Sequence, residues 1–253
     1  MKICRLIFST NRIEFLVPTL ESHKKHIDFG NHEVYSILID DYPKERNNGQ
    51  IVEIARNYGI DHIHLHKENL GITKTWNEAW SIIASKEFDY VWHHEDDVVF
   101  KQDIEIQTLI DFLNTDPKKY CQVTLKRNPW YKHEINELPI LDGDFDFNDY
   151  KITLRDDYFW SLAALYPHWI TQEPMKQTQG WNPGEWPIMQ YLKQKYDMRT
   201  AIIKNYDGSN IVDHIGTYFQ GKRVAQNEPG WEKFKVIDPN KKYCSKTGVE
   251  LEL

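Results

Sequence analysis

Cysteine, long hydrophobic runs and excess positive charge are all missing or scarce in this chain. The three cysteines are widely spaced and odd in number, so they indicate neither a disulfide framework nor a zinc site. Reduced thiols in a cytoplasmic protein are the simplest expectation. No run approaches the roughly 18 apolar residues of a transmembrane helix, and the apolar segment after Met1 is too short for a signal peptide. The net charge of −7 argues against a nucleic-acid-binding surface.

The remaining composition is that of an ordinary globular protein. The chain has 253 residues, 40% of them hydrophobic and 27% charged, which suits one large α/β domain or two small ones. Aromatic residues make up 13% of the sequence, which is high. Exposed aromatic rings often stack on sugars or bases, but we expect most of these rings to lie in the core.

Strand and helix patterns alternate through the first hundred residues, which predicts a parallel sheet with crossover helices. The expected strands are 3–8, 34–39, 62–65 and 90–93, and the expected helices are 13–27, 51–58 and 72–83. The second half is less regular. We expect strands at 121–126, 158–165 and 201–203, and a solvated acidic loop at 141–149.

Three consecutive carboxylates, Glu95, Asp96 and Asp97, follow the strand at 90–93. Carboxylates are seldom buried, and three in a row repel one another, so a cluster at the end of a buried strand requires a cation. Hard oxygen ligands suit Mg²⁺ or Mn²⁺, ions that usually bridge to phosphate. A solvated acidic turn is the alternative.

The strands at 3–8 and 34–39 also end in polar loops. Ser9–Arg12 follows the first of them and Asp40–Asp41 follows the second. In open parallel sheets, ligands bind outside the carboxyl ends of the strands. We therefore expect these two loops and Glu95–Asp97 to converge on one crevice, which favours a binding site over an acidic turn.

The order of these motifs resembles the GT-A fold glycosyltransferases, particularly the family 2-like group. The resemblance covers residues 2–100 well and residues 155–220 more loosely. It implies a mixed, mainly parallel α/β sheet flanked by helices, in a single domain over 1–253. Residues 1–100 would be the nucleotide-binding half and 101–253 the acceptor-binding half. The implied activity is metal-dependent, inverting transfer of a sugar from a nucleotide-sugar to an acceptor hydroxyl of a glycan or glycoconjugate.

The same resemblance implies a nucleotide pocket in the first half. Asp40 or Asp41 would accept a hydrogen bond from a base N–H, which uracil, thymine and guanine offer, so the donor would be of the UDP, dTDP or GDP type. A helix cap or Asx turn is the alternative for these two residues. The other residues of the implied pocket are Ser9, Thr10, Arg12, Asn69 and Gly71. Arg12 could pair bidentately with phosphate or be an exposed loop cation. Gly71 could allow close backbone approach or simply start a helix.

The resemblance also implies a metal site. Asp97 is the expected ligand for Mn²⁺ or Mg²⁺, with Asp96 in support and Glu95 reaching the ribose or a metal-bound water. His214 matches the late-loop histidine that several GT-A enzymes supply as a third ligand. A structural role is the alternative for His214, and Asp213 is a weaker candidate ligand.

Glu185 fits the catalytic base that the resemblance places at a helix start. Neighbouring Trp and Pro residues would raise its pKa and improve it as a base. A first-turn glutamate that complements the helix dipole is the alternative. Trp181 and Trp186 could stack on a sugar or pack in the core, and the loop with Lys222 and Arg223 could close over the diphosphate or remain solvated.

Two other functions stay open at the sequence level. A sugar-1-phosphate nucleotidyltransferase has a related sheet and paired acids, but it normally needs a Gly-rich loop after its first strand, and Ser9–Arg12 contains no glycine. A non-catalytic carbohydrate-binding protein would explain the many Trp and Tyr residues.

Overall fold

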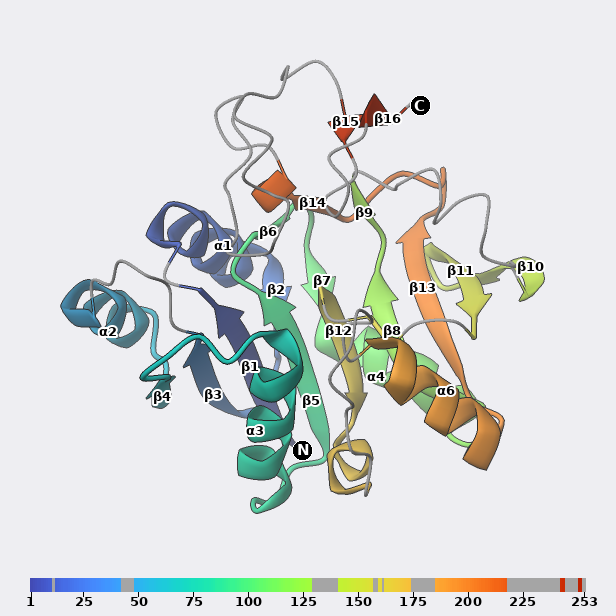
Figure 1. Ribbon diagram of the computed structural model, residues 1–253. Helices are drawn as coiled ribbons and strands as arrows, with labels where there is room; N and C mark the ends of the chain where they lie inside the picture. The colour runs from blue at the N-terminus through green and yellow to red at the C-terminus, as the bar shows by residue number, and fades with distance from the viewer. Residues whose placement is uncertain are drawn as a thin grey trace.

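One sheet contains strands from both halves of the sequence (Figure 1). The computed structural model describes residues 1–10, 12–41, 48–128, 141–156, 159–160, 162–173, 185–217, 242–243 and 250–251. Within these ranges the sheet has nine strands in the order β10-β11-β13-β8-β12-β5-β1-β3-β4. They are β1 (Lys2–Ser9), β3 (Glu33–Asp40), β4 (His62–Leu65), β5 (Tyr90–Glu95), β8 (Tyr120–Leu125), β10 (Leu141–Phe147), β11 (Tyr150–Arg155), β12 (Ala163–Pro167) and β13 (Arg199–Asn205).

All strands of this sheet except β11 and β12 point the same way. Parallel pairing joins β5, β1, β3 and β4, and also joins β8 to β13. The strand β12 runs antiparallel between β5 and β8, and β11 runs antiparallel between β10 and β13. The predicted mixed, mainly parallel α/β fold is therefore confirmed.

Helices cover both faces of the sheet (Figure 1). They are α1 (Ile13–His26), α2 (Asn48–Asn57), α3 (Ile72–Ala84), α4 (Ile106–Thr115) and α6 (Glu185–Tyr196). Alternate residues of β1 point to opposite faces, as expected for a strand. Leu6 and Phe8 pack in one cluster with α3 and α6, whereas Ile7 packs with α1 and α2, and Ile3 with α4.

Short elements extend this framework at its edges. β6 (Val98–Phe100), β14 (Val212–His214) and β9 (Arg127–Asn128) form a small separate sheet in that order. The remaining elements are β2 (Ile27–Asp28), which pairs with β7 (Ile104–Glu105), the 3₁₀ turns η1 (His168–Gln172) and η2 (Ile215–Thr217), and the pair β15 (Lys242–Tyr243) and β16 (Glu250–Leu251).

The acidic loop predicted at 141–149 is wrong, because this segment forms β10 and the turn of a hairpin with β11. Phe145 and Phe147 pack against the core, whereas Asp144 and Asp146 are exposed. Asp144 is held by Lys204 at 2.6 Å, and the turn places Asn148 at a φ of 51°. The strand predicted at 158–165 also differs, because β12 is Ala163–Pro167. The strand β10 was not predicted because its exposed acidic residues make the segment look polar, whereas strands are predicted from alternating apolar residues.

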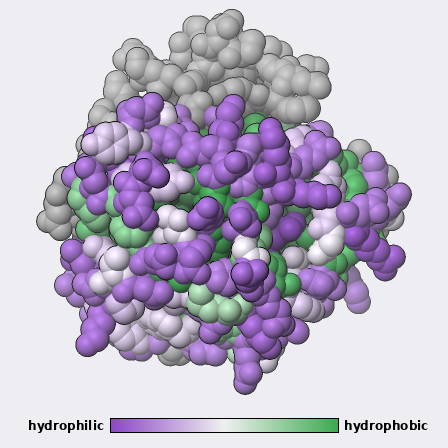
Figure 2. All heavy atoms as spheres, turned by 180° about the vertical axis from the view of Figure 1, so that it is seen from behind, coloured by the Kyte–Doolittle hydropathy of each residue, from purple (hydrophilic) through white to green (hydrophobic). Residues whose placement is uncertain are grey.

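The outer surface seen from behind is mainly hydrophilic, with hydrophobic side chains showing between polar ones (Figure 2). None of the helices within the described ranges is long and apolar enough to cross a membrane.

A buried histidine links α1 to the centre of the sheet. Trp92 Nε1 donates a hydrogen bond to His23 Nε2 at 3.0 Å, so this ring nitrogen carries no proton. Burial lowers the pKa of His23 well below its ordinary value, and the neighbouring Arg5 and His94 lower it further. The fold therefore holds His23 as a neutral acceptor.

This histidine should make stability sensitive to acid. The unfolded chain takes up a proton near the ordinary pKa of 6.5, whereas the folded chain does so only at lower pH. The unfolded state then binds more protons, so the contribution of His23 to the free energy of unfolding falls as pH drops below 6.5, by up to about 1.4 kcal/mol per pH unit. His23→Phe should reduce this slope in urea unfolding while costing about 1–3 kcal/mol near neutral pH, because Trp92 loses its acceptor. An unchanged slope would contradict the neutral assignment.

Candidate functional site

Three strand ends lie side by side and bring the predicted loops together. Ser9, at the end of β1, is opposite Asp40 at the end of β3. On the other side of β1, Phe8 is opposite Glu95 at the end of β5. The backbone N–H of Thr10 donates to Asp96 Oδ2 at 3.1 Å. The acidic cluster therefore lies against the Ser9–Arg12 loop, at the carboxyl edge of the parallel strands.

Arg12 is buried against two of the three carboxylates. Its guanidinium contacts both oxygens of Asp96 and lies 3.1 Å from Asp97 Oδ2. The sequence left Arg12 as either a partner of phosphate or an exposed loop cation, whereas here its partners are these two side chains. Burial by itself would lower the pKa of Arg12, but Asp96 and Asp97 outweigh burial and raise it. Arg12 is therefore a permanent cation within the cluster.

The pKa values of the two aspartates shift in opposite directions. Burial raises the pKa of Asp96 above its ordinary value, against the opposing effect of Arg12. Burial also acts to raise the pKa of Asp97, but there Arg12 and His214 outweigh it and leave the pKa below its ordinary value. Asp97 is thus the more firmly ionised of the pair.

Glu95, Asp97 and His214 form a group in which one ligand atom of each lies within 4.8 Å of the others. The pairing of β14 with β6 delivers His214 opposite Val98, directly beside the cluster. The Ile215 N–H then donates to the Asp97 carbonyl at 2.8 Å, which fixes this arrangement.

These residues fit a hard divalent cation. Asp97 Oδ1 is buried and accepts no hydrogen bond from the described residues, whereas Oδ2 faces Arg12 and also lies 3.2 Å from His214 Nε2. A buried, ionised oxygen without a donor is a costly feature that a cation relieves. Two carboxylates and one imidazole are a donor set that Mn²⁺ or Mg²⁺ accepts.

His214 currently acts as a hydrogen-bond donor to Asp97. Arg127 Nη1 lies 3.1 Å from His214 Nδ1 and can only donate, so Nδ1 accepts and Nε2 carries the proton. Metal ligation through Nε2 would require the proton to move to Nδ1 and Arg127 to turn away. The weaker candidate, Asp213, instead forms an ion pair with Lys101 at 3.0 Å.

Asp41 holds the turn that precedes α3. Its carboxylate accepts hydrogen bonds from the N–H groups of Leu70 (2.8 Å) and Gly71 (2.9 Å) and lies 3.0 Å from His66 Nδ1. Gly71 has a φ of 74°, a conformation that favours glycine. Asp40 is fully buried, and Asn69 is exposed on the same turn. Sequence reasoning missed His66, although the alternation of His62, His64 and His66 was an available signal.

The helix predicted to start near Glu185 does begin at that residue, as α6. The structure describes only the backbone there, so the side chains of Glu185 and Trp186 lie outside the description. Trp181, Lys222 and Arg223 also lie outside the described residues.

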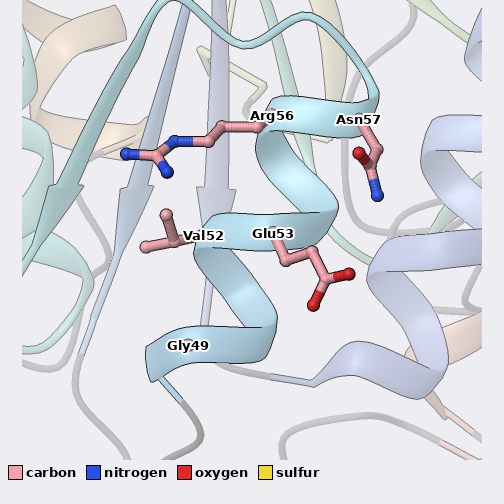
Figure 3. Close-up of a pocket in the computed structure, with 5 residues that line it drawn as sticks. All are labelled: Gly49, Val52, Glu53, Arg56 and Asn57. Atoms are coloured by element: carbon pink, nitrogen blue, oxygen red, sulfur yellow. The ribbon is translucent and has the colours of Figure 1, made fainter.

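A surface hollow lies along α2 (Figure 3). The described residues that line it are Gly49, Val52, Glu53, Arg56 and Asn57, all on that helix. None of the predicted site residues that the structure describes is among them.

Gly216 packs so closely on Asp97 that a methyl group there would overlap Asp97 Oδ2. Gly216→Ala should therefore displace the carboxylate and lower the free energy of unfolding by about 1–3 kcal/mol, the usual cost of overpacking. Urea unfolding measures this loss. Gly49→Ala is the matched control, because no atom of the described residues lies within 4 Å of the added methyl group. Equal stability of the two variants would show that Asp97 is not held as described.

Comparison with known proteins identifies the fold. No family model matches the sequence, and no curated protein matches it. Among solved structures, S. aureus TarS matches with a TM-score of 0.53 and 14% identity over 86% of this chain and 37% of that one. A TarS 1–349 structure in complex with UDP matches with a TM-score of 0.51 and 14% identity, over 84% of this chain and 60% of that one.

The mannosyltransferase PcManGT from Pyrobaculum calidifontis, in complex with GDP-Man and Mn²⁺, matches with a TM-score of 0.56 and 11% identity. This match covers 79% of the present chain and 56% of the mannosyltransferase. The chain thus spans less than two thirds of the length of each of these proteins. TarS and PcManGT are GT-A fold glycosyltransferases. The chain described here has the GT-A glycosyltransferase fold.

Proposed function

We propose that this chain is a metal-dependent, inverting glycosyltransferase that moves a sugar from a nucleotide-sugar to an acceptor hydroxyl of a glycan or glycoconjugate. The observation that supports this most directly is the Glu95–Asp97–His214 group at the carboxyl edge of a GT-A sheet. Ligands of open α/β sheets bind outside this edge. The likeness to structures with UDP and with GDP-Man and Mn²⁺ supports a donor of the UDP, GDP or dTDP type.

Glu95 and Asp97 would hold Mn²⁺ or Mg²⁺, joined by His214 once Arg127 releases Nδ1. A cation bound there would supply Lewis-acid stabilisation of the negative charge on the departing diphosphate. Arg12 serves this arrangement by holding Asp96 and Asp97 in place and by keeping Asp97 ionised. Its role is positioning, since its guanidinium already faces two carboxylates.

The nucleoside would lie against the ends of β1 and β3, where Ser9 is opposite Asp40 and Thr10 follows Ser9. Asp40 would accept from the N–H of the base. Asp41 would contribute indirectly, because its carboxylate holds the backbone turn at Leu70 and Gly71 that borders this pocket. Asn69 is exposed on that turn and would border the same pocket.

Glu185 would be the general base. In the displacement, the acceptor hydroxyl gives its proton to the Glu185 carboxylate while its oxygen bonds to the anomeric carbon. The bond from that carbon to the diphosphate oxygen breaks on the opposite side, and the diphosphate keeps the electron pair. Configuration at the anomeric carbon is therefore inverted.

Asp97→Asn should lower turnover by about 100-fold or more, because it removes one of the charged groups that would hold the cation. The measurement is sugar transfer or nucleotide-sugar hydrolysis, with a panel of UDP-, GDP- and dTDP-sugars and with added Mn²⁺. Asp103→Asn is the matched control, because the Asp103 side chain is 88% exposed and lies outside the cluster. Full activity of Asp97→Asn would overturn the metal assignment.

Glu185→Gln should keep the affinity for donor nucleotide but lower the rate of transfer by roughly 10²–10⁴-fold, the usual contribution of a general base. Thermal shift with the nucleotide-sugar reports the affinity, and product formation reports the rate. Glu53→Gln, an exposed position on α2, should change neither quantity. Normal transfer by Glu185→Gln would show that the base is another residue.

A further inference from the structure

A second group of metal-ligating side chains lies on the other side of Asp41 from the acidic cluster. His64 in β4, His66 just after β4 and Glu78 in α3 each offer one ligand atom, all within 4.8 Å of one another. His64 and His66 are two positions apart, so an extended backbone places them on one side of the strand. Among the described residues, this is the only such group besides Glu95–Asp97–His214.

Both imidazoles converge on a single carboxylate. His64 Nε2 lies 2.8 Å from Glu78 Oε1, and His66 Nε2 lies 2.9 Å from Glu78 Oε2. The two rings are 5.2 Å apart between centroids and 79° apart in plane, so they approach from different directions. Ligand atoms of a tetrahedral Zn²⁺ with bonds near 2.0–2.1 Å lie about 3.3 Å apart. A small outward movement of the carboxylate would make room for the ion.

The hydrogen bond of His66 to Asp41 leaves its Nε2 in the form that a metal ligand requires. Asp41 is an acceptor whose carboxylate already takes two backbone N–H groups, so His66 Nδ1, at 3.0 Å from it, carries a proton. In a neutral ring, the lone pair of Nε2 then points at the Glu78 carboxylate, 2.9 Å away. Two acceptors at that distance repel unless a positive ion or a second proton lies between them.

Asp41, His66 and an ion at Nε2 would form the carboxylate–histidine–metal arrangement that fixes ring orientation and increases ligand basicity. His214 in the acidic cluster has the opposite environment, because an arginine faces its second nitrogen. Of the two groups, the one that contains His66 is the better prepared to give an imidazole to a metal.

The donor types select a different ion from that of the acidic cluster. Two imidazoles and one carboxylate suit Zn²⁺ and similar transition metals, whereas Mg²⁺ and Mn²⁺ prefer oxygen ligands. His66 is buried, but the side chains of His64 and Glu78 are 33% and 35% exposed, so an ion and a fourth, water ligand can enter from solvent.

We propose that His64, His66 and Glu78 bind Zn²⁺, with Asp41 orienting His66. The ion would join β4, which is the edge strand of the large sheet, to α3. It would also stiffen the turn at Leu70 and Gly71, since Asp41 contacts both that turn and His66.

The test is titration of the whole metal-free chain with Zn²⁺ by calorimetry and with Co²⁺ by visible absorption, which reports tetrahedral coordination. We expect the parent chain to bind one equivalent of ion. His64→Ala and Glu78→Gln should lose this equivalent, with the affinity for the ion weakened more than about 100-fold. Loss of an outer partner alone already costs roughly 10–100-fold in metal affinity. Zn²⁺ should also raise the melting temperature of the parent chain but not of these variants.

His62→Ala is the matched control. His62 lies on the same strand, with its ring 6.4 Å from that of His64, yet it is not part of the group. This control and Asp97→Asn should both retain the equivalent of ion, which separates this site from the proposed catalytic one. Circular dichroism verifies the fold of each variant. The proposal is overturned if the parent chain binds no Zn²⁺, or if folded His64→Ala and Glu78→Gln bind Zn²⁺ as tightly as the parent does.

Discussion

The ion pair of Arg12 with Asp96 and Asp97 is the interaction on which the rest of the site depends. The three side chains are 11%, 1% and 3% exposed, so water screens their charges little. Breaking a buried pair by removing one partner typically costs about 3–5 kcal/mol. One cation against two carboxylates leaves a net negative charge, and Glu95 adds to it. The cluster is therefore both held together and left with an attraction for a further cation.

The same loop organises the elements around it. The Arg12 carbonyl accepts the first N–H groups of α1, from Phe15 and Leu16. One turn later, Thr19 Oγ1 donates to the Asp96 carbonyl at 2.8 Å and accepts from the Val98 N–H at 3.1 Å. The residue before α1 and the second turn of α1 thus both contact the acidic loop. The catalytic chemistry proposed here rests on α1 as much as on the strands that carry the acids.

Much of the first half could be predicted from the sequence because its strands are apolar and its helices show regular spacing. β4 was predicted at the residues it occupies, and the place of Asp97 at a strand end followed from pattern alone. The side chains and backbone groups that each site residue contacts could not be predicted in the same way. Nothing in the sequence distinguishes an arginine that meets phosphate from Arg12, which meets two carboxylates, or a base-binding aspartate from Asp41, which holds a turn. Glu78 joins two histidines only because α3 packs beside β4, so that group was invisible without the fold.

The delivery of His214 by β14 has a consequence for the order in which the site is assembled. β1, α1 and β5 are early in the chain, whereas β14 pairs with β6 only after most of the described chain has been made. Arg12 and Asp97 are both made before β14, so during synthesis their ion pair can form before His214 is present. Arg12 supplies a counter-charge to Asp96 and Asp97 from within the first half of the chain. The acidic strand end can therefore pack before β14 brings His214, the last of the proposed ligands.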